Sequence, residues 1–106
     1  MLSIGDLINQ IKLYNPNADF DLIKKSYNYG FNAHKGQYRA SGEIYFTHPV
    51  QVAKIVIDLK LDESTIKTAL LHDTVEDTDS SLNQLEIVFG KEVSQLVDGV
   101  TKLTNL

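Results

Sequence analysis

The chain has 106 residues, of which 42% are hydrophobic and 23% charged, a size and composition typical of one soluble globular domain. The absence of cysteine excludes disulfides and thiolate metal sites, so a bound metal would need His, Asp, Glu and water as ligands. The formal net charge of −4 argues against a nucleic-acid surface built on bulk positive charge. No apolar stretch reaches the length of a membrane span, and polar residues interrupt the segment where a signal peptide would stand. We therefore expect a cytoplasmic protein with neither nucleic acid nor membrane as a partner.

Two helices are expected in the first third of the chain. Ser3 followed by Asp6 is typical of a helix start, and apolar residues recur at helical spacing up to Ile11. Residues 14–17 are expected to end this helix. A second helix is expected from near Asp19 to about His34. Its inner face is expected to hold Leu22, Ile23, Tyr27 and Phe31. An imidazole is favourable at the negative end of a helix, so we favour a structural role for His34 over a metal-ligand role.

A polar loop is expected between the second and third helices, over residues 35–45. It is rich in glycine and in hydrogen-bond donors, and it shows no hydrophobic period. Loops of this kind often carry binding groups. The plain alternative is a solvated connection between two helices.

The third helix is expected to begin with Thr47 or His48 near the N-cap and Pro49 in the first turn. Its inward residues are expected to be Val52, Ala53, Ile55, Val56 and Leu59. Asp62 is a plausible cap for a fourth, central helix. The inward residues of the central helix are expected to be Ile66, Ala69, Leu70 and Val75.

Two more helices are expected towards the end of the sequence. Residues 81–84 resemble a capping box, and Gly90 resembles a C-cap. The last helix is expected from Lys91 to about Leu103. Its inward residues are expected to be Val93, Leu96, Val97, Val100 and Leu103. Since no segment alternates as a strand does, we predict an all-α fold.

A polar cluster follows the apolar residues 69–71 of the central helix. If the helix continues, His72, Asp73, Glu76 and Asp77 all project within one sector of it. An imidazole and three carboxylates on a partly buried helix are costly unless a cation or polar partners satisfy them. The alternative is an ordinary acidic helix end facing solvent.

His48 is expected to join this cluster, because helices connected by a short loop usually pack antiparallel. Two imidazoles and a carboxylate suit a divalent cation such as manganese, iron or zinc, and three protein ligands leave coordination positions open. Such a cation acidifies water and polarises a phosphoryl oxygen, while Glu76 and Asp77 could transfer protons. Taken alone, His48 could instead cap its helix, and His72 could be a core histidine.

Several blocks of the sequence, in order, resemble the hydrolase domain of the RelA/SpoT family. The blocks are Ala33–Glu43, Tyr45–Pro49, Leu70–Thr78, Phe89–Gly90 and Asp98–Leu103. That family removes the 3′-diphosphate from (p)ppGpp, the alarmone of the stringent response, in a manganese-dependent reaction. The resemblance implies an HD-domain phosphohydrolase-like helical bundle that binds a guanine nucleotide, ppGpp or pppGpp.

The resemblance also implies roles for the polar cluster. His48, His72 and Asp73 match the metal ligands, with Mn²⁺ expected and other divalent cations chemically acceptable. Glu76 and Asp77 match the catalytic acidic pair.

The same resemblance makes the loop a substrate-binding segment. Arg39 and Ser41 match the part that holds the guanine nucleotide, with Arg39 expected to act by stacking or cationic contact. Lys35 and Tyr45, in the same loop, are also expected to bind substrate.

Three departures from the family pattern stand out. Ala40 replaces a basic residue, and Ile44 replaces a proline. The sequence ends at Leu106, before the further helices of the family's domain, which carry an additional aspartate ligand. We therefore expect residues 1–106 to be a single HD-type domain truncated at its C-terminus, without the synthetase domain. Apolar faces left by missing helices favour a homo-oligomer, or a complementary chain that supplies them.

Three functions are compatible with these observations. The leading one is a (p)ppGpp pyrophosphohydrolase. The second is an inactive remnant or split-gene half that binds metal, nucleotide or a partner chain without turnover. A different HD phosphohydrolase is a third, which the match of residues 35–43 to the RelA/SpoT pattern disfavours.

Overall fold

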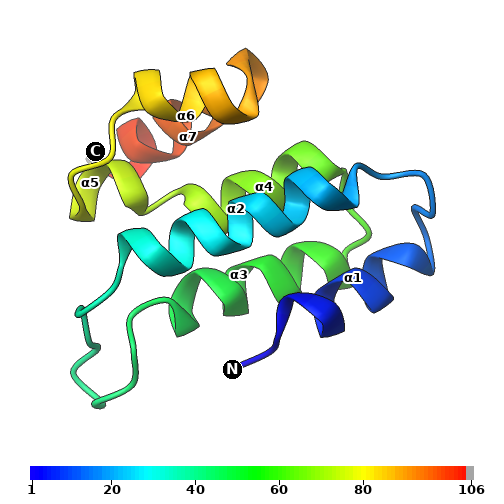
Figure 1. Ribbon diagram of the computed structural model, residues 1–106, viewed down its shortest axis with the longest axis horizontal. Coiled ribbons are helices and arrows are strands. Elements are labelled where there is room, and N and C mark those ends of the chain that lie inside the picture. The colour runs from blue at the N-terminus through cyan, green and yellow to red at the C-terminus, as the bar shows by residue number, and fades with distance from the viewer. Residues whose placement is uncertain (105–106) are drawn as a thin grey trace.

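The computed structural model describes residues 1–104, which form seven helices (Figure 1). The last two positions of the expected 1–106 domain lie outside the described residues. The helices are α1 (Ile4–Lys12), α2 (Phe20–Ala33), α3 (Thr47–Asp58), α4 (Glu63–Leu71), α5 (Thr74–Asp77), α6 (Leu82–Phe89) and α7 (Lys91–Thr104). Within residues 1–104 the only β pairing is one isolated antiparallel bridge, between Tyr38 and Ile44 in the polar loop. The prediction of an all-α fold is confirmed.

Local capping signals set most helix starts where the sequence predicts them. Ser3 and Ser81 each form a complete capping box, with Asp6 and Gln84 as the reciprocal partners. Asp62 accepts a hydrogen bond from the Thr65 backbone N–H and begins α4. These bonds satisfy N–H groups that have no partner within the helix, and each typically contributes about 1 kcal/mol.

α3 begins at Thr47 with Pro49 in its first turn, as predicted, but neither Thr47 nor His48 is the N-cap residue itself. Phe46 is the N-cap residue and gives no side-chain hydrogen bond, while Thr47 and His48 occupy the first two helical positions. Phe46 is buried and packs edge-on against Tyr27 of α2, at 5.1 Å between ring centroids. Tertiary packing therefore fixes this helix start in place of a cap.

The core has two parts, and α4 contributes to both. Leu70 lies in a cluster shared with α1, α2 and α3, whereas the next residue, Leu71, lies in a second cluster with α6 and α7. Both leucines are fully buried. Burial of each contributes about 2 kcal/mol. The chain is thus held from two sides immediately before His72.

The predicted inner faces of α3 and α7 need correction. The buried residues of α3 are Thr47, Pro49, Val50, Ala53 and Ile57. Ile55 and Leu59, predicted to point inward, are 60% and 65% exposed. Leu96 and Leu103 of α7 are likewise exposed, and Phe31 lies at the exposed margin of α2. In α3, apolar residues occupy both sides of the helix, so periodicity does not select one face.

Gly30 of α2 lies close to the backbone of α4 and to the Phe46 ring. A Cβ atom at this position would stand 2.5 Å from Phe46 Cε1 and 2.7 Å from the Leu70 carbonyl oxygen. A glycine inside a helix costs about 1 kcal/mol relative to alanine. Here the missing side chain lets the two helices approach closely.

Every helix within residues 1–104 is too short or too polar to cross a membrane.

Candidate metal centre

The chain between α4 and α5 departs from the single central helix predicted to continue at least to Val75. α4 ends at Leu71, His72 and Asp73 form a turn, and α5 is a separate four-residue helix. The His72 ring lies 2.7 Å from the Ala69 carbonyl, and the Thr74 hydroxyl donates to the Leu71 carbonyl at 2.8 Å. Side chains thus bond the carbonyl groups that a continuing helix would use, which favours a helix end. The prediction that these side chains share one sector assumed a continuous helix, and that condition is not met.

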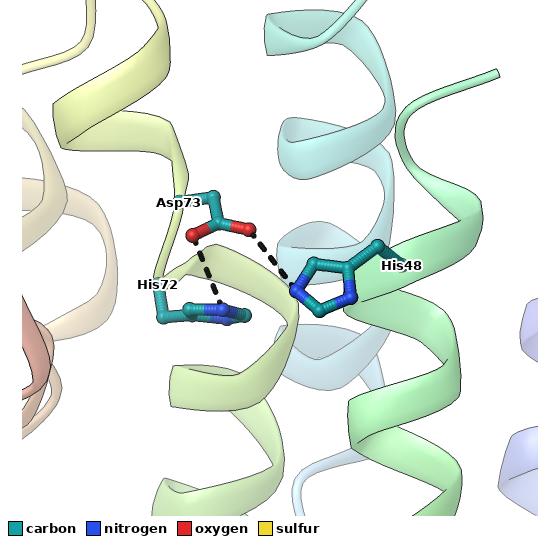
Figure 2. Close-up of side chains that lie close together, drawn as sticks. All are labelled: His48, His72 and Asp73. Carbon is teal, nitrogen blue, oxygen red and sulfur yellow. Dashed lines mark ion pairs between the residues drawn. The ribbon is translucent and has the colours of Figure 1, made fainter. Parts of the chain in front are cut away.

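The turn brings His72 and Asp73 beside the first turn of α3, as antiparallel packing of α3 and α4 requires. The Asp73 carboxylate lies between the two imidazoles (Figure 2). Its Oδ1 is 3.2 Å from His72 Nε2, and its Oδ2 is 3.6 Å from His48 Nε2. The His72 and Asp73 side chains are 13% exposed and that of His48 is 37% exposed, so solvent reaches the cluster from the His48 side.

The tautomer of His72 follows from its partners. A backbone carbonyl only accepts hydrogen bonds, so Nδ1 of His72 carries the proton that Ala69 receives. In the neutral ring, Nε2 then presents a lone pair towards the Asp73 carboxylate. This second-sphere carbonyl contact is the one that orients histidine ligands in metal sites.

The three side chains fit a divalent cation. One ligand atom from each lies within 4.8 Å of the others. Ligands about 2.1 Å from a common ion stand about 3.0–4.2 Å apart, so a small contraction would suffice. The Asp73 carboxylate also repels the Nε2 lone pair of His72 unless a cation or a proton lies between them. His48, His72 and Asp73 would hold the metal, with coordination positions left open.

Tyr45 connects this cluster to Asp77. Its hydroxyl lies 2.8 Å from Asp73 Oδ2 and 3.2 Å from Asp77 Oδ2. Burial raises the pKa of the Tyr45 hydroxyl, and the hydrogen bond to Asp73 and the charges of Asp73 and Asp77 raise it further. The phenol therefore keeps its proton at neutral pH and acts as a donor. Sequence reasoning assigned Tyr45 to substrate binding and gave no sign of this contact.

Glu76 and Asp77 lie on α5, one residue apart and both exposed. Asp77 is connected to the cluster by the Tyr45 hydroxyl, which also bonds Asp73. The Glu76 carboxylate accepts a hydrogen bond from the Thr104 hydroxyl of α7 at 3.4 Å. The two acids are therefore held by different parts of the fold.

The other loop residues expected to bind substrate have different surroundings. Arg39 donates to the Gln51 side chain at 3.3 Å, one turn along α3 from His48. Ser41 donates to Glu43 within the exposed tip of the loop, at 3.2 Å. Lys35 is exposed at the beginning of the loop.

His34 is the C-cap residue of α2, as its position at the helix end predicts. It is 2% exposed, and its Nδ1 lies 3.0 Å from the Gln37 side-chain oxygen. Gln37 in turn donates to the Asp77 carbonyl at 2.6 Å. Sequence reasoning missed Gln37, because no local signal shows that its side chain reaches a residue forty positions away.

Comparison with known proteins gives consistent results. The profile of the HD domain family matches residues 26–106. A GTP pyrophosphokinase of Myxococcus xanthus is 53% identical over 94 residues, which are 89% of this chain and 12% of that protein. The bifunctional (p)ppGpp synthase/hydrolase SpoT of Escherichia coli K12 is 46% identical over 100 residues, 93% of this chain and 14% of that protein. The chain thus spans about one eighth of the length of these relatives.

A solved structure also resembles this one. It is described as a metazoan orthologue of SpoT that hydrolyses ppGpp. The TM-score is 0.71 with 34% sequence identity, and the match covers 74% of this chain and 47% of the other.

Proposed function

Because the chain belongs to the HD domain family and its relatives include SpoT, we propose that it carries the metal-binding half of a (p)ppGpp 3′-pyrophosphohydrolase site. The observation that carries this proposal is the cluster of His48, His72 and Asp73, with Asp77 attached to it through Tyr45. The names of the relatives support the substrate class. The geometry supports a metal-dependent hydrolytic role.

The proposed cofactor is Mn²⁺, with other divalent cations as substitutes, since a His/Asp ligand set without thiolate accepts several of them. A cation held there supplies a Lewis acid, which polarises a phosphoryl oxygen and acidifies water. His72 is prepared as a ligand by its contact with Ala69. Asp73 is prepared by the Tyr45 hydroxyl, which orients its Oδ2.

The proposed reaction is attack of water on the phosphorus atom attached to the ribose 3′ oxygen. The new bond joins the water oxygen to phosphorus, and the bond from phosphorus to the 3′ oxygen breaks. Asp77, oriented by Tyr45, takes the proton from water. Glu76 supplies the proton that the leaving 3′ oxygen needs, so pyrophosphate and a guanosine 5′-di- or triphosphate result.

The polar loop is the proposed nucleotide-binding segment. The Arg39 guanidinium bonds Gln51, which lies one helical turn from His48, so it can face a phosphate or stack on a base at the rim of the site. Lys35 and Ser41 are exposed on the same loop and are available to a charged nucleotide. Together they supply local positive charge and hydrogen-bond donors to a chain whose net charge is negative.

The experiment that tests this function is pyrophosphate release from ppGpp by the purified chain, with and without Mn²⁺. We expect manganese-dependent release that His72→Ala abolishes. Asp98→Asn is the matched control, because it removes a carboxylate that forms an ion pair with Lys102 on the surface of α7. No release at any manganese concentration, with the cation bound, would reject the proposed activity.

A double variant, Glu76→Ala with Asp77→Ala, separates an enzyme from a binding protein. The proposal requires loss of turnover while Mn²⁺ affinity stays near that of the wild type. Unchanged turnover would remove both acids from the proton-transfer role.

A further inference from the structure

The Gln37 side chain connects the end of α2 to the end of α5. Its amide nitrogen donates to the Asp77 carbonyl at 2.6 Å, and its amide oxygen lies 3.0 Å from Nδ1 of His34. His34 is itself fixed, because it is 2% exposed and its ring lies against the rings of Tyr45 and Phe46. We call these two hydrogen bonds, from His34 to Gln37 and from Gln37 to the Asp77 backbone, the relay.

The donor and the acceptor of each hydrogen bond in this relay can be assigned by starting from the Asp77 carbonyl. The Asp77 carbonyl only accepts, so the Gln37 amide nitrogen must face it and the amide oxygen must face His34. That oxygen also only accepts, so Nδ1 of His34 carries the proton. Nε2 of His34 is then a bare acceptor in the neutral ring, and it is buried without a hydrogen-bond partner among the described residues.

α5 needs external support because it has only four residues. A single helical turn fixes several backbone dihedrals for one hydrogen bond and is unstable in isolation. Its last carbonyl groups have no partner within the helix, and Gln37 bonds the one that belongs to Asp77. Tyr45 bonds the carboxylate of the same residue.

We propose that His34 and Gln37 are positioning residues that hold α5, and with it the Asp77 carboxylate, against the metal cluster. His34 fixes the orientation of the Gln37 amide, and Gln37 fixes the end of α5. The kinetic consequence rests on the proposed function, whereas the structural consequence does not.

The first test is amide hydrogen exchange by NMR on the full chain. The Asp77 and Thr78 amides donate within α5, to Asp73 and Thr74. We expect Gln37→Leu and His34→Leu to raise their exchange rates about three- to tenfold, the equivalent of one net hydrogen bond. The Leu85 amide at the start of α6 is the internal control and should not change.

A second pair of variants separates the hydrogen bond from ring packing. His34→Asn keeps a side-chain N–H near the place of Nδ1 but loses the ring, whereas His34→Leu keeps apolar bulk and loses the donor. The relay predicts slower α5 exchange in His34→Asn than in His34→Leu. The reverse order, or no change in either, would show that His34 only fills space and would overturn the proposal.

Kinetics supply the functional test. We expect Gln37→Leu and His34→Leu each to lower kcat about three- to tenfold at unchanged KM for ppGpp, with recovery in His34→Asn. The double variant His34→Leu with Gln37→Leu should have a kcat no lower than that of either single variant, because both substitutions interrupt the same relay. Additive losses, or a change in KM alone, would contradict the relay. If the wild-type chain releases no pyrophosphate, the proposed function fails, and amide exchange still decides the relay.

Discussion

The hydroxyl of Tyr45 donates to Oδ2 of Asp73 at 2.8 Å and so joins the polar loop to the turn that carries two of the three candidate ligands. Oδ2 is also the oxygen that lies 3.6 Å from His48 Nε2. The phenol therefore orients the carboxylate oxygen that faces His48.

Removing that hydroxyl tests its orienting role. Tyr45→Phe keeps the ring that packs on His34, at 4.9 Å between centroids, and loses only the donor. Loss of such an outer contact typically costs about tenfold or more in metal affinity or activity. We expect this loss in Mn²⁺ titration and in turnover. Tyr38→Phe, on the same loop and 66% exposed, is the matched control. Equal affinity in both variants would contradict the role given to Tyr45.

Metal binding should stabilise the fold, because the three ligands come together only in the folded chain. At a free Mn²⁺ concentration of 100 times Kd, the free energy of unfolding should rise by about 2.7 kcal/mol. For a domain of this size, that corresponds to a Tm increase of roughly 10 °C, which EDTA should reverse. His72→Ala should show almost no increase. A full increase in that variant would place the metal elsewhere.

Two glycine substitutions should have opposite effects on stability. In Gly30→Ala the new methyl group meets the Phe46 ring and the Leu70 carbonyl, so we expect a loss of about 1–3 kcal/mol despite better helix propensity. In Gly99→Ala on α7 nothing lies within 4 Å, and we expect a gain of about 0.5–1 kcal/mol. Urea unfolding measures both. A Gly30→Ala variant as stable as the wild type would show that α2 can move away from α4 at little cost.

Protonation of Asp62 in acid should lower the stability of the α4 N-terminus, which the Asp62 carboxylate caps. The Thr65 hydroxyl first, and the Thr65 backbone N–H second, lower the pKa of Asp62 below its ordinary value of 3.8. Because the folded pKa is lower than the unfolded one, this stabilisation is present at neutral pH. It is lost as the pH falls below about 3.8.

Asp62→Asn keeps a good N-cap without a titrating group. Unfolding in urea at pH 7 and pH 3 should therefore show a smaller acid-dependent loss of stability in the variant. An equal loss in the variant and the wild type would exclude Asp62 as a source of acid sensitivity.

Sequence reasoning succeeded where the signal is local. The capping boxes at Ser3 and Ser81 depend on residues three positions apart, and the structure confirms both. The same reasoning failed at His72 and Asp73, where the helix breaks and side chains bond the Ala69 and Leu71 carbonyls. Helical periodicity carries no information about such bonds. It also could not choose between two apolar sides of α3.

The candidate site divides in the same way. His72 and Asp73 are neighbours, and a simple packing argument brought His48 to them. The partners that orient Asp73 and Asp77 come from Tyr45 and Gln37, which are 28 to 40 positions distant. Such contacts depend on the path that the polar loop takes in the folded chain. The loop has no periodic pattern from which that path could be predicted.

The ligands come from α3 and from the turn that follows α4, and this division has a practical consequence. His72 and Asp73 are adjacent in sequence, whereas His48 comes from α3, which packs beside α4 (Figure 1). An unfolded or loosened chain keeps the adjacent pair but loses the third ligand. The dissociation constant for the cation should therefore rise when α3 and α4 move apart. A substitution deep in the interface of α3 and α4, remote from any ligand, should lower metal affinity before it measurably unfolds the chain.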